Sequence, residues 1–215
     1  MKKIALVIVL TIGLLLSFAM TASAEILFGA SGEIGGTDFE ADYASGSSSD
    51  VSDSPTQFFL NGSLNLLGTH VSLEYSDVDA DHFQFSTIDF RVGWQLGLDI
   101  FKVKAFGGYE RFRFSDDALT ANQDNTYSSV VGGVGFESKI KKVTFSASAL
   151  IPVATRFSND AIDDDDADLK YLKVGIAYAP LPMVDLFVNY RDLKGESEVV
   201  DITAQSYTAG VKISF

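Results

Sequence analysis

The last ten residues read SYTAGVKISF (residues 206–215), and they alternate strictly between two kinds of side chain. One set is apolar or small and comprises Tyr207, Ala209, Val211, Ile213 and Phe215. The intervening set is polar or small and comprises Ser206, Thr208, Gly210, Lys212 and Ser214. A period of two places these sets on opposite faces of a β-strand, so the chain ends in a strand with one apolar face.

The same period recurs along the chain. It is found in nine further segments, at about 26–34, 58–66, 70–76, 88–96, 101–110, 129–137, 143–151, 171–178 and 184–191. The composition, with 18 Gly, 17 Phe and only 4 Pro, also favours strands. Alternation alone would fit a soluble β-sandwich equally well, so the connections between the strands have to decide.

Long and short connections between the predicted strands alternate along the chain. The long ones are acidic, at about 36–56, 77–82, 115–126, 152–168 and 194–201, and the short ones are at about 67–69, 97–100, 139–142 and 180–183. Long loops at one end and tight turns at the other are typical of a transmembrane β-barrel. We therefore predict an all-β, antiparallel, up-and-down transmembrane barrel of ten strands. Eight strands are the alternative, if the segments around 180–182 form an external hairpin.

Aromatic residues support the barrel independently of loop length. On the apolar faces, one group falls near the short turns (Trp94, Phe101, Phe145, Tyr178 and Phe215) and the other near the long loops (Phe58, Tyr75, Tyr109, Tyr190 and Tyr207). A barrel that crosses two lipid–water interfaces places aromatic residues at both.

The N-terminus has the features of an export signal. Lys2 and Lys3 precede an apolar run from Ile4 to Leu16, and Ala22-Ser23-Ala24 provides a cleavage site before Glu25. We predict a cleaved signal peptide at 1–24 and a single barrel domain at 25–215. The absence of cysteine excludes a lipoprotein anchor and thiolate metal sites.

The chain resembles the bacterial outer-membrane β-barrel proteins, from small eight-stranded to ten-stranded members. The last strand carries this resemblance, because it ends in Phe215 with apolar or aromatic residues at every second position before it. The resemblance implies integral location in the outer membrane, contact with its lipid and lipopolysaccharide, and recognition of Tyr207, Ala209, Val211, Ile213 and Phe215 by the barrel-assembly machinery. It implies no substrate. We expect a monomer.

Charged residues occupy the polar faces of the predicted strands and should point into the lumen. They are six acids and six bases: Glu33, Glu74, Asp89, Arg91, Lys102, Lys104, Glu110, Glu137, Lys173, Asp185, Arg191 and Lys212. Such a set could line a channel, or its ion pairs could fill the narrow interior as a plug. We favour a largely plugged lumen and a structural or surface-interaction role. The alternative is a narrow cation-preferring porin.

Acidity is concentrated in the long loops. They hold 20 of the 29 Asp and Glu residues, and removal of Lys2 and Lys3 changes the formal charge from −13 to −15. This charge argues against a nucleic-acid partner. The carboxylates of Asp163, Asp164, Asp165, Asp166 and Asp168 could bind calcium, although the run lacks the glycine and terminal Glu of an EF-hand loop. A solvated loop is the explanation we favour, with attraction of cations or of a basic partner as the alternatives, and we expect no other cofactor.

Two enzyme functions have less support in the sequence than a non-enzymatic barrel. His70-Val71-Ser72 has the spacing found in lipid A deacylase barrels, but it follows a short turn, at the wrong end for outer-leaflet lipid. Asp79-Ala80-Asp81-His82 resembles the Asp and His groups of outer-membrane proteases, but no other long loop contains a histidine. We therefore predict that the chain is not an enzyme.

Overall fold

The computed structural model describes residues 26–44, 46, 48–51, 55–66, 68–80, 83–98, 100–116, 124–159, 163–164 and 167–215. The predicted signal peptide and its cleavage site lie outside these residues. No helix in the described part is long and apolar enough to cross a membrane.

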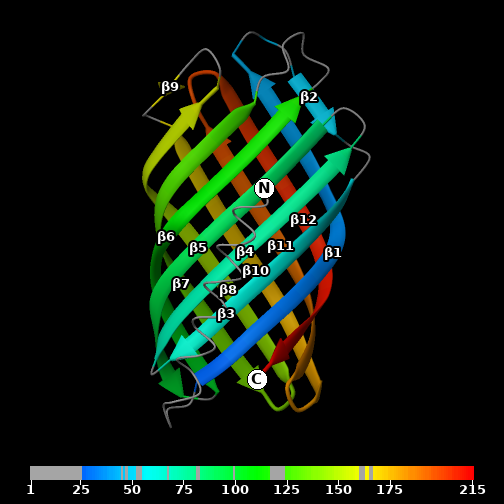
Figure 1. The fold of residues 1–215 in the computed structure, drawn as a ribbon, viewed down its shortest axis with the longest axis vertical. Coiled ribbons are helices and arrows are strands. Elements are labelled where there is room, and N and C mark those ends of the chain that lie inside the picture. Colours follow the sequence, from blue (N-terminus) through cyan, green and yellow to red (C-terminus); the bar gives the residue numbers. More distant parts are fainter. Residues whose placement is uncertain are drawn as a thin grey trace, which may run out of the picture.

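Ten long strands form a closed antiparallel barrel, in which each strand pairs with its neighbours in the chain (Figure 1). They are β1 (Ile26–Tyr43), β3 (Thr56–Leu66), β4 (Thr69–Ala80), β5 (Phe83–Leu98), β6 (Phe101–Asp116), β7 (Asn125–Ile140), β8 (Val143–Ser158), β10 (Asp168–Leu181), β11 (Val184–Glu196) and β12 (Val200–Ser214). Two short strands, β2 (Ser48–Val51) and β9 (Asp163–Asp164), extend the sheet next to β1 and β8.

The barrel closes between its first and last strands. Glu33 of β1 lies opposite Gly210 of β12, and the backbone groups of Phe28 and Phe215 exchange hydrogen bonds of 3.0 and 2.8 Å. Closure leaves no edge strand, which is what a sheet needs in lipid, where unpaired backbone groups have no water to bind.

The ten-strand prediction is confirmed, and the eight-stranded alternative is wrong. The strands on either side of Pro182 are both part of the barrel wall, since β10 pairs with β8 and β11, and β11 pairs with β12. The turn between them needs a left-handed residue, which is Met183 with φ 71°. We call the end of the barrel with the short turns and Phe215 the turn end, and the opposite end the loop end.

The predicted long loops are partly strand. β1 continues to Tyr43 and β8 continues to Ser158, although both segments were predicted to be loop from Gly36 and Pro152 onward. The reason is a change in the pattern: on β1, Phe39 and Ala41 point inward and are buried, whereas Asp38, Glu40 and Asp42 are exposed. The alternation is intact but its polarity is inverted, so the acidic positions were mistaken for loop.

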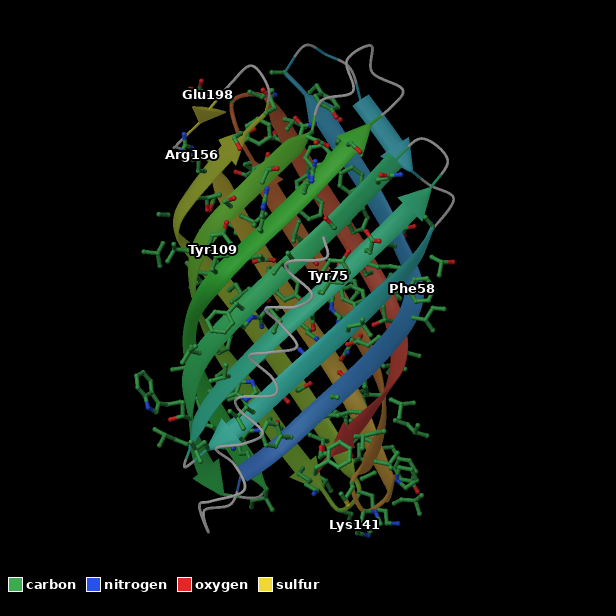
Figure 2. All side chains as sticks on the ribbon, in the orientation of Figure 1. Phe58, Tyr75, Tyr109, Lys141, Arg156 and Glu198 are labelled. Carbon is green, nitrogen blue, oxygen red and sulfur yellow. The ribbon has the colours of Figure 1, made fainter. Side chains whose placement is uncertain are left out.

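Aromatic side chains mark where this inversion occurs. Figure 2 shows Phe58, Tyr75 and Tyr109 at similar heights on the outer surface, with Arg156 and Glu198 near the loop end and Lys141 at the turn end. Tyr207 at 61% exposure and Trp94 at 68% belong to the two predicted aromatic groups, and both point outward. We call the wall between the two groups the membrane segment, and the wall beyond Phe58, Tyr75 and Tyr109 the extension.

The dimensions agree with this division. On β6 the two aromatic groups are marked by Phe101 and Tyr109, so the stretch from one to the other is 9 residues long, as expected for a tilted strand that crosses hydrocarbon. The same strand continues to Asp116, with Arg111 and Arg113 on its outer face. Arginine on the outer face is suited to water, so the extension projects from the membrane.

Candidate functional site in the barrel interior

The interior changes its chemistry from the turn end to the loop end. At the turn end is a cavity of about 640 Å³, which we call the vestibule. Its lining includes the turn residues Ile100 and Lys141, so it opens at that end. Ten of the twelve predicted lumen residues line it, namely Glu33, Glu74, Asp89, Arg91, Lys102, Lys104, Glu137, Lys173, Asp185 and Lys212. The other two, Glu110 and Arg191, are buried at a deeper level, next to a small cavity of about 30 Å³.

Arg191 is the centre of an ion-pair layer that forms the floor of the vestibule. Its guanidinium contacts Glu33 at 2.7 Å and Glu74 at 3.4 Å, and its Nη1 donates to Thr208 Oγ1 at 2.8 Å. Lys173 Nζ lies 2.8 Å from Glu74 and 3.9 Å from Glu33. The Arg191 and Glu33 side chains are only 3% and 2% exposed, so each charge depends on its partners rather than on water.

A second arginine extends the ion-pair layer. Arg91 pairs with Asp89 on the same strand, and its guanidinium lies 5.3 Å from the ring centres of both Phe106 and Tyr171. Arg191 in turn lies 3.7 Å from the ring centre of Phe59. Planar guanidinium groups stack on aromatic faces in this way, which fixes both arginines in place. The ion-pair layer comprises Glu33, Glu74, Asp89, Arg91, Lys173 and Arg191.

Glu110, like Asp185, is a predicted lumen acid without a cationic partner at bonding distance in the described part of the chain. It is 2% exposed, it lies opposite Asp89 in the sheet, and its Oε2 atom has no hydrogen-bond partner among the described residues. Glu110 therefore adds a second buried carboxyl group beside the Asp89–Arg91 pair.

Neutral polar groups form the next level, the hydroxyl layer. Ser206 Oγ donates to Gln57 Oε1 at 2.7 Å, and Gln57 Nε2 donates to Ser76 Oγ at 3.1 Å. Thr37 and Thr87 continue this chain through Ser206 and Ser76, respectively. The layer connects five strands and lies on the loop-end side of the ion pairs.

An aromatic layer occupies the interior of the extension. Phe39, Phe85, Phe112 and Phe114 have ring centres 5.5–6.2 Å apart and are at most 3% exposed. Tyr127 and Phe157 form a further pair at 5.0 Å, and the Tyr127 hydroxyl donates to the Val200 carbonyl oxygen. Sequence reasoning missed this layer, although the run Phe39-Glu40-Ala41-Asp42-Tyr43 carries the signal.

The vestibule itself has partly exposed charges. Lys104 and Lys102 share Glu137, at 3.0 and 3.7 Å, and these three side chains are 25–29% exposed. Asp185 lies opposite Lys212 on the paired strands β11 and β12. His70 also lines the vestibule, and its Nδ1 is 2.8 Å from Asn65 Oδ1. Ser72 lines the same cavity, so both residues of the His-x-Ser spacing lie near the turn end.

The candidate calcium residues are only partly described. Asp163 and Asp164 pair through their backbones with β8, and Asp165 and Asp166 lie outside the described residues. Asp168 accepts a bond from the Leu169 amide and pairs with Lys170 at 2.7 Å, which raises the pKa of Lys170. The described residues contain no group of three or more side chains suited to bind a metal. Asp81 and His82 also lie outside the described residues.

Three features together define a transmembrane β-barrel: an apolar outer belt, a closed sheet and a charged inner face. Lipid surrounds the apolar belt and requires the sheet to be closed, whereas charged side chains are excluded from lipid and point inward. The outer face of the last strand agrees with this, since Val211, Ile213 and Phe215 are 44%, 42% and 63% exposed. Among soluble proteins such a continuous exposed apolar surface is rare.

Comparison with solved structures gives the same architecture. The outer membrane protease OmpT of Escherichia coli matches 90% of this chain and 98% of its own, with a TM-score of 0.66 and 9% identity. Neisserial surface protein A (15% identity, 87% and 97% covered) and the β domain of the Bordetella autotransporter BrkA (12%, 87% and 99%) both match with TM-scores of 0.46. The OmpT likeness shows a shared fold: the chain has the outer-membrane β-barrel architecture. Neither a protein family nor a curated protein matches it.

Proposed function

We propose that this chain is a non-conducting barrel of the outer membrane with a structural or surface-interaction role. The observation that carries the proposal is the succession of three filled layers above the vestibule. An ion entering from the turn end meets the Arg191 ion pairs, then the hydroxyl layer and then the buried Phe39, Phe85, Phe112 and Phe114. Moving an ion through an apolar layer without water is strongly unfavourable.

Planar-bilayer recording tests this proposal. The purified mature chain should give no conductance steps, whereas the variant Arg191→Ala/Phe39→Ala/Phe112→Ala/Phe114→Ala, which removes the centre of the ion-pair layer as well as the aromatic layer, should conduct, or conduct intermittently. The matched control is Phe90→Ala, because Phe90 points outward and is 43% exposed. Protease protection in the same bilayer lipids verifies insertion, so that a flat record is informative.

The alternative function is a narrow cation-preferring pore. It predicts small, cation-selective steps from the unmodified chain, with selectivity that falls when Asp163–Asp166 are replaced by Asn. Such steps would overturn the non-conducting role. A flat record from an inserted protein, together with conduction by the variant that lacks Arg191 and the three rings, would eliminate the pore.

The loop end provides the surface for an interaction. Asp38, Glu40 and Asp42 are exposed on β1, and Asp201 lies opposite Asp42 on β12. This surface should attract cations, calcium among them, or a basic partner. Calcium titration followed by calorimetry should show weak binding that the Asp163–Asp166→Asn variant loses; strong binding that survives this change would point away from the acidic run.

We expect no enzyme activity. Of the described residues, His70 is the single histidine; it contacts Asn65 and lies in the vestibule, far from the loop end. OmpT is named a protease, but a likeness at 9% identity carries no active site. A peptide-cleavage assay that showed turnover lost in His82→Ala would contradict this expectation.

The last strand should direct assembly of a monomer in lipid and lipopolysaccharide. Deletion of Phe215 should slow folding when the assembly machinery is present and leave spontaneous folding into vesicles nearly unchanged. Equal slowing in both settings would indicate a structural role for Phe215 at the β1–β12 closure instead.

A further inference from the structure

The vestibule has an excess of positive charge in an otherwise acidic protein. Its outer part is lined by five lysines and two acids: Lys102, Lys104, Lys139, Lys141, Lys212, Glu137 and Asp185. The deeper acids in the lining, Glu33, Glu74 and Asp89, already pair with Arg191, Lys173 and Arg91. The whole chain has a formal charge of −13, so the vestibule is of opposite sign to the protein that surrounds it.

The lysines are not neutralised by their neighbours. Two of them, Lys102 and Lys104, share the single carboxylate of Glu137. Lys212 makes no ion pair with any residue of the described part of the chain, although its side chain is only partly exposed and points into the same cavity. A cavity with low-dielectric walls and charge of one sign focuses its field and concentrates counter-ions.

The rest of the lining is suited to an oxygen-rich ligand. Hydroxyl and amide groups of Ser31, Ser63, Ser146, Asn61 and Asn189 face the cavity beside the lysines. Phe106 and Phe187 add two apolar surfaces. A volume of about 640 Å³ is within the range of small-molecule sites, and the ion-pair layer closes the inner end. The vestibule is therefore a blind pocket with one mouth, rather than part of a passage.

We propose that the vestibule is a binding site for a small anion, bearing carboxylate or phosphate groups, that enters from the turn end. Lys104 and Lys212 would contact the anion, and Lys102, Lys139 and Lys141 would attract it to the mouth. The proposal goes beyond the surface role above, because it concerns the opposite end of the barrel. It requires no conduction and holds whether or not the acidic loops bind a partner.

Calorimetry with inorganic pyrophosphate and citrate as probes tests the proposal. The full mature chain is reconstituted in nanodiscs of zwitterionic lipid at low salt. We expect saturable binding of about one anion per chain, no binding of glycerol as a neutral probe, and weaker binding as salt is raised.

Three variants locate the site. Lys104→Gln/Lys212→Gln should weaken binding about tenfold or more, because charge-assisted hydrogen bonds are lost. Glu137→Gln should strengthen binding, because it removes a competing carboxylate. Lys142→Gln is the matched control, since Lys142 is at the same end but bonds outside the cavity to the Pro180 carbonyl at 3.3 Å. It should bind within about twofold of the unmodified chain.

The source of the anion is distinguished by the lipid. If a phosphatidylglycerol headgroup occupies the vestibule, nanodiscs that contain this lipid should weaken pyrophosphate binding to the unmodified chain but not to the Lys104→Gln/Lys212→Gln variant. If the natural ligand is soluble, the lipid should have little effect. Absence of saturable binding, or binding that the double variant retains while Glu137→Gln leaves it unchanged, would overturn the proposal.

Discussion

The membrane segment and the extension are built from the same strands but have opposite polarity. In the membrane segment, outward residues such as Val134 and Phe90 are apolar, and inward residues such as Glu33 and Arg191 are charged. In the extension, Phe112 is buried inside while Arg111 and Arg113 on the same strand point outward. The change takes place around the level of Tyr109, within one continuous β-ladder.

The comparison shows that backbone pairing between strands does not depend on which face of the sheet is apolar. Lipid outside requires an apolar outer face and leaves the polar groups to satisfy one another inside. Water outside restores the usual arrangement, with an apolar core of the kind that stabilises soluble sheets. A barrel that crosses and then leaves the membrane therefore has two kinds of interior, ion pairs in one and aromatic rings in the other.

The largest expected effect comes from removing the centre of the ion-pair layer. Arg191→Met leaves the buried Glu33 and Glu74 without their main partner and should lower the free energy of unfolding by about 3–5 kcal/mol. Urea unfolding of the vesicle-inserted protein measures this. The control is Lys102→Met, whose side chain is 29% exposed in the vestibule; its loss should be about 1 kcal/mol or less. Equal losses would show that burial of the ion pairs is unimportant.

The extension should respond to a cavity rather than to an unpaired charge. Phe112→Ala removes a fully buried ring from the aromatic layer and should cost about 3 kcal/mol in unfolding free energy. Phe90→Ala removes the same group from the lipid-facing surface, where no cavity forms, and should cost about half as much or less. The same unfolding assay compares them. A larger loss for Phe90→Ala would mean that the extension is loosely packed.

Sequence analysis predicted the membrane segment well and the extension poorly. The period of two assigned twelve charged residues to the lumen, because the opposite face of each strand was apolar. The ion-pair partners could not be predicted from the sequence. Lys173 pairs with Glu74, 99 positions away, and Arg191 pairs with Glu33, 158 positions away. Both pairs depend on the curvature of the closed sheet. Phe39 and Phe157 fell within the predicted long connections at 36–56 and 152–168, although both lie on strands.

An outward charge tests the boundary between the two regions directly. Val134→Arg places a charge on the lipid-facing side of β7 and should cost about 2 kcal/mol or more. Ser128→Glu places a charge on the same side of the same strand, six positions nearer the loop end and opposite Arg111 and Arg156, and should change stability by about 0.5 kcal/mol or less. Similar values at the two positions would mean that both lie in the same medium.

The smallest effect is expected for an ion pair on the outside of the extension. Arg113 pairs with Asp124, and their side chains are 50% and 53% exposed. A double-mutant cycle with Arg113→Gln and Asp124→Asn should give a coupling of about 0–1 kcal/mol that decreases with salt. A coupling as large as the loss in Arg191→Met would show that lipid, rather than water, surrounds this pair.

The most direct test of the inverted polarity uses the absence of cysteine from the sequence. Nitroxide labels are attached to Ala105→Cys in the membrane segment and to Arg113→Cys in the extension, on the same face of β6. In vesicles, the label at 105 should be relaxed by oxygen and shielded from a water-soluble nickel chelate, and the label at 113 should show the reverse. Relaxation by oxygen at both positions, or by the nickel chelate at both, would contradict the account.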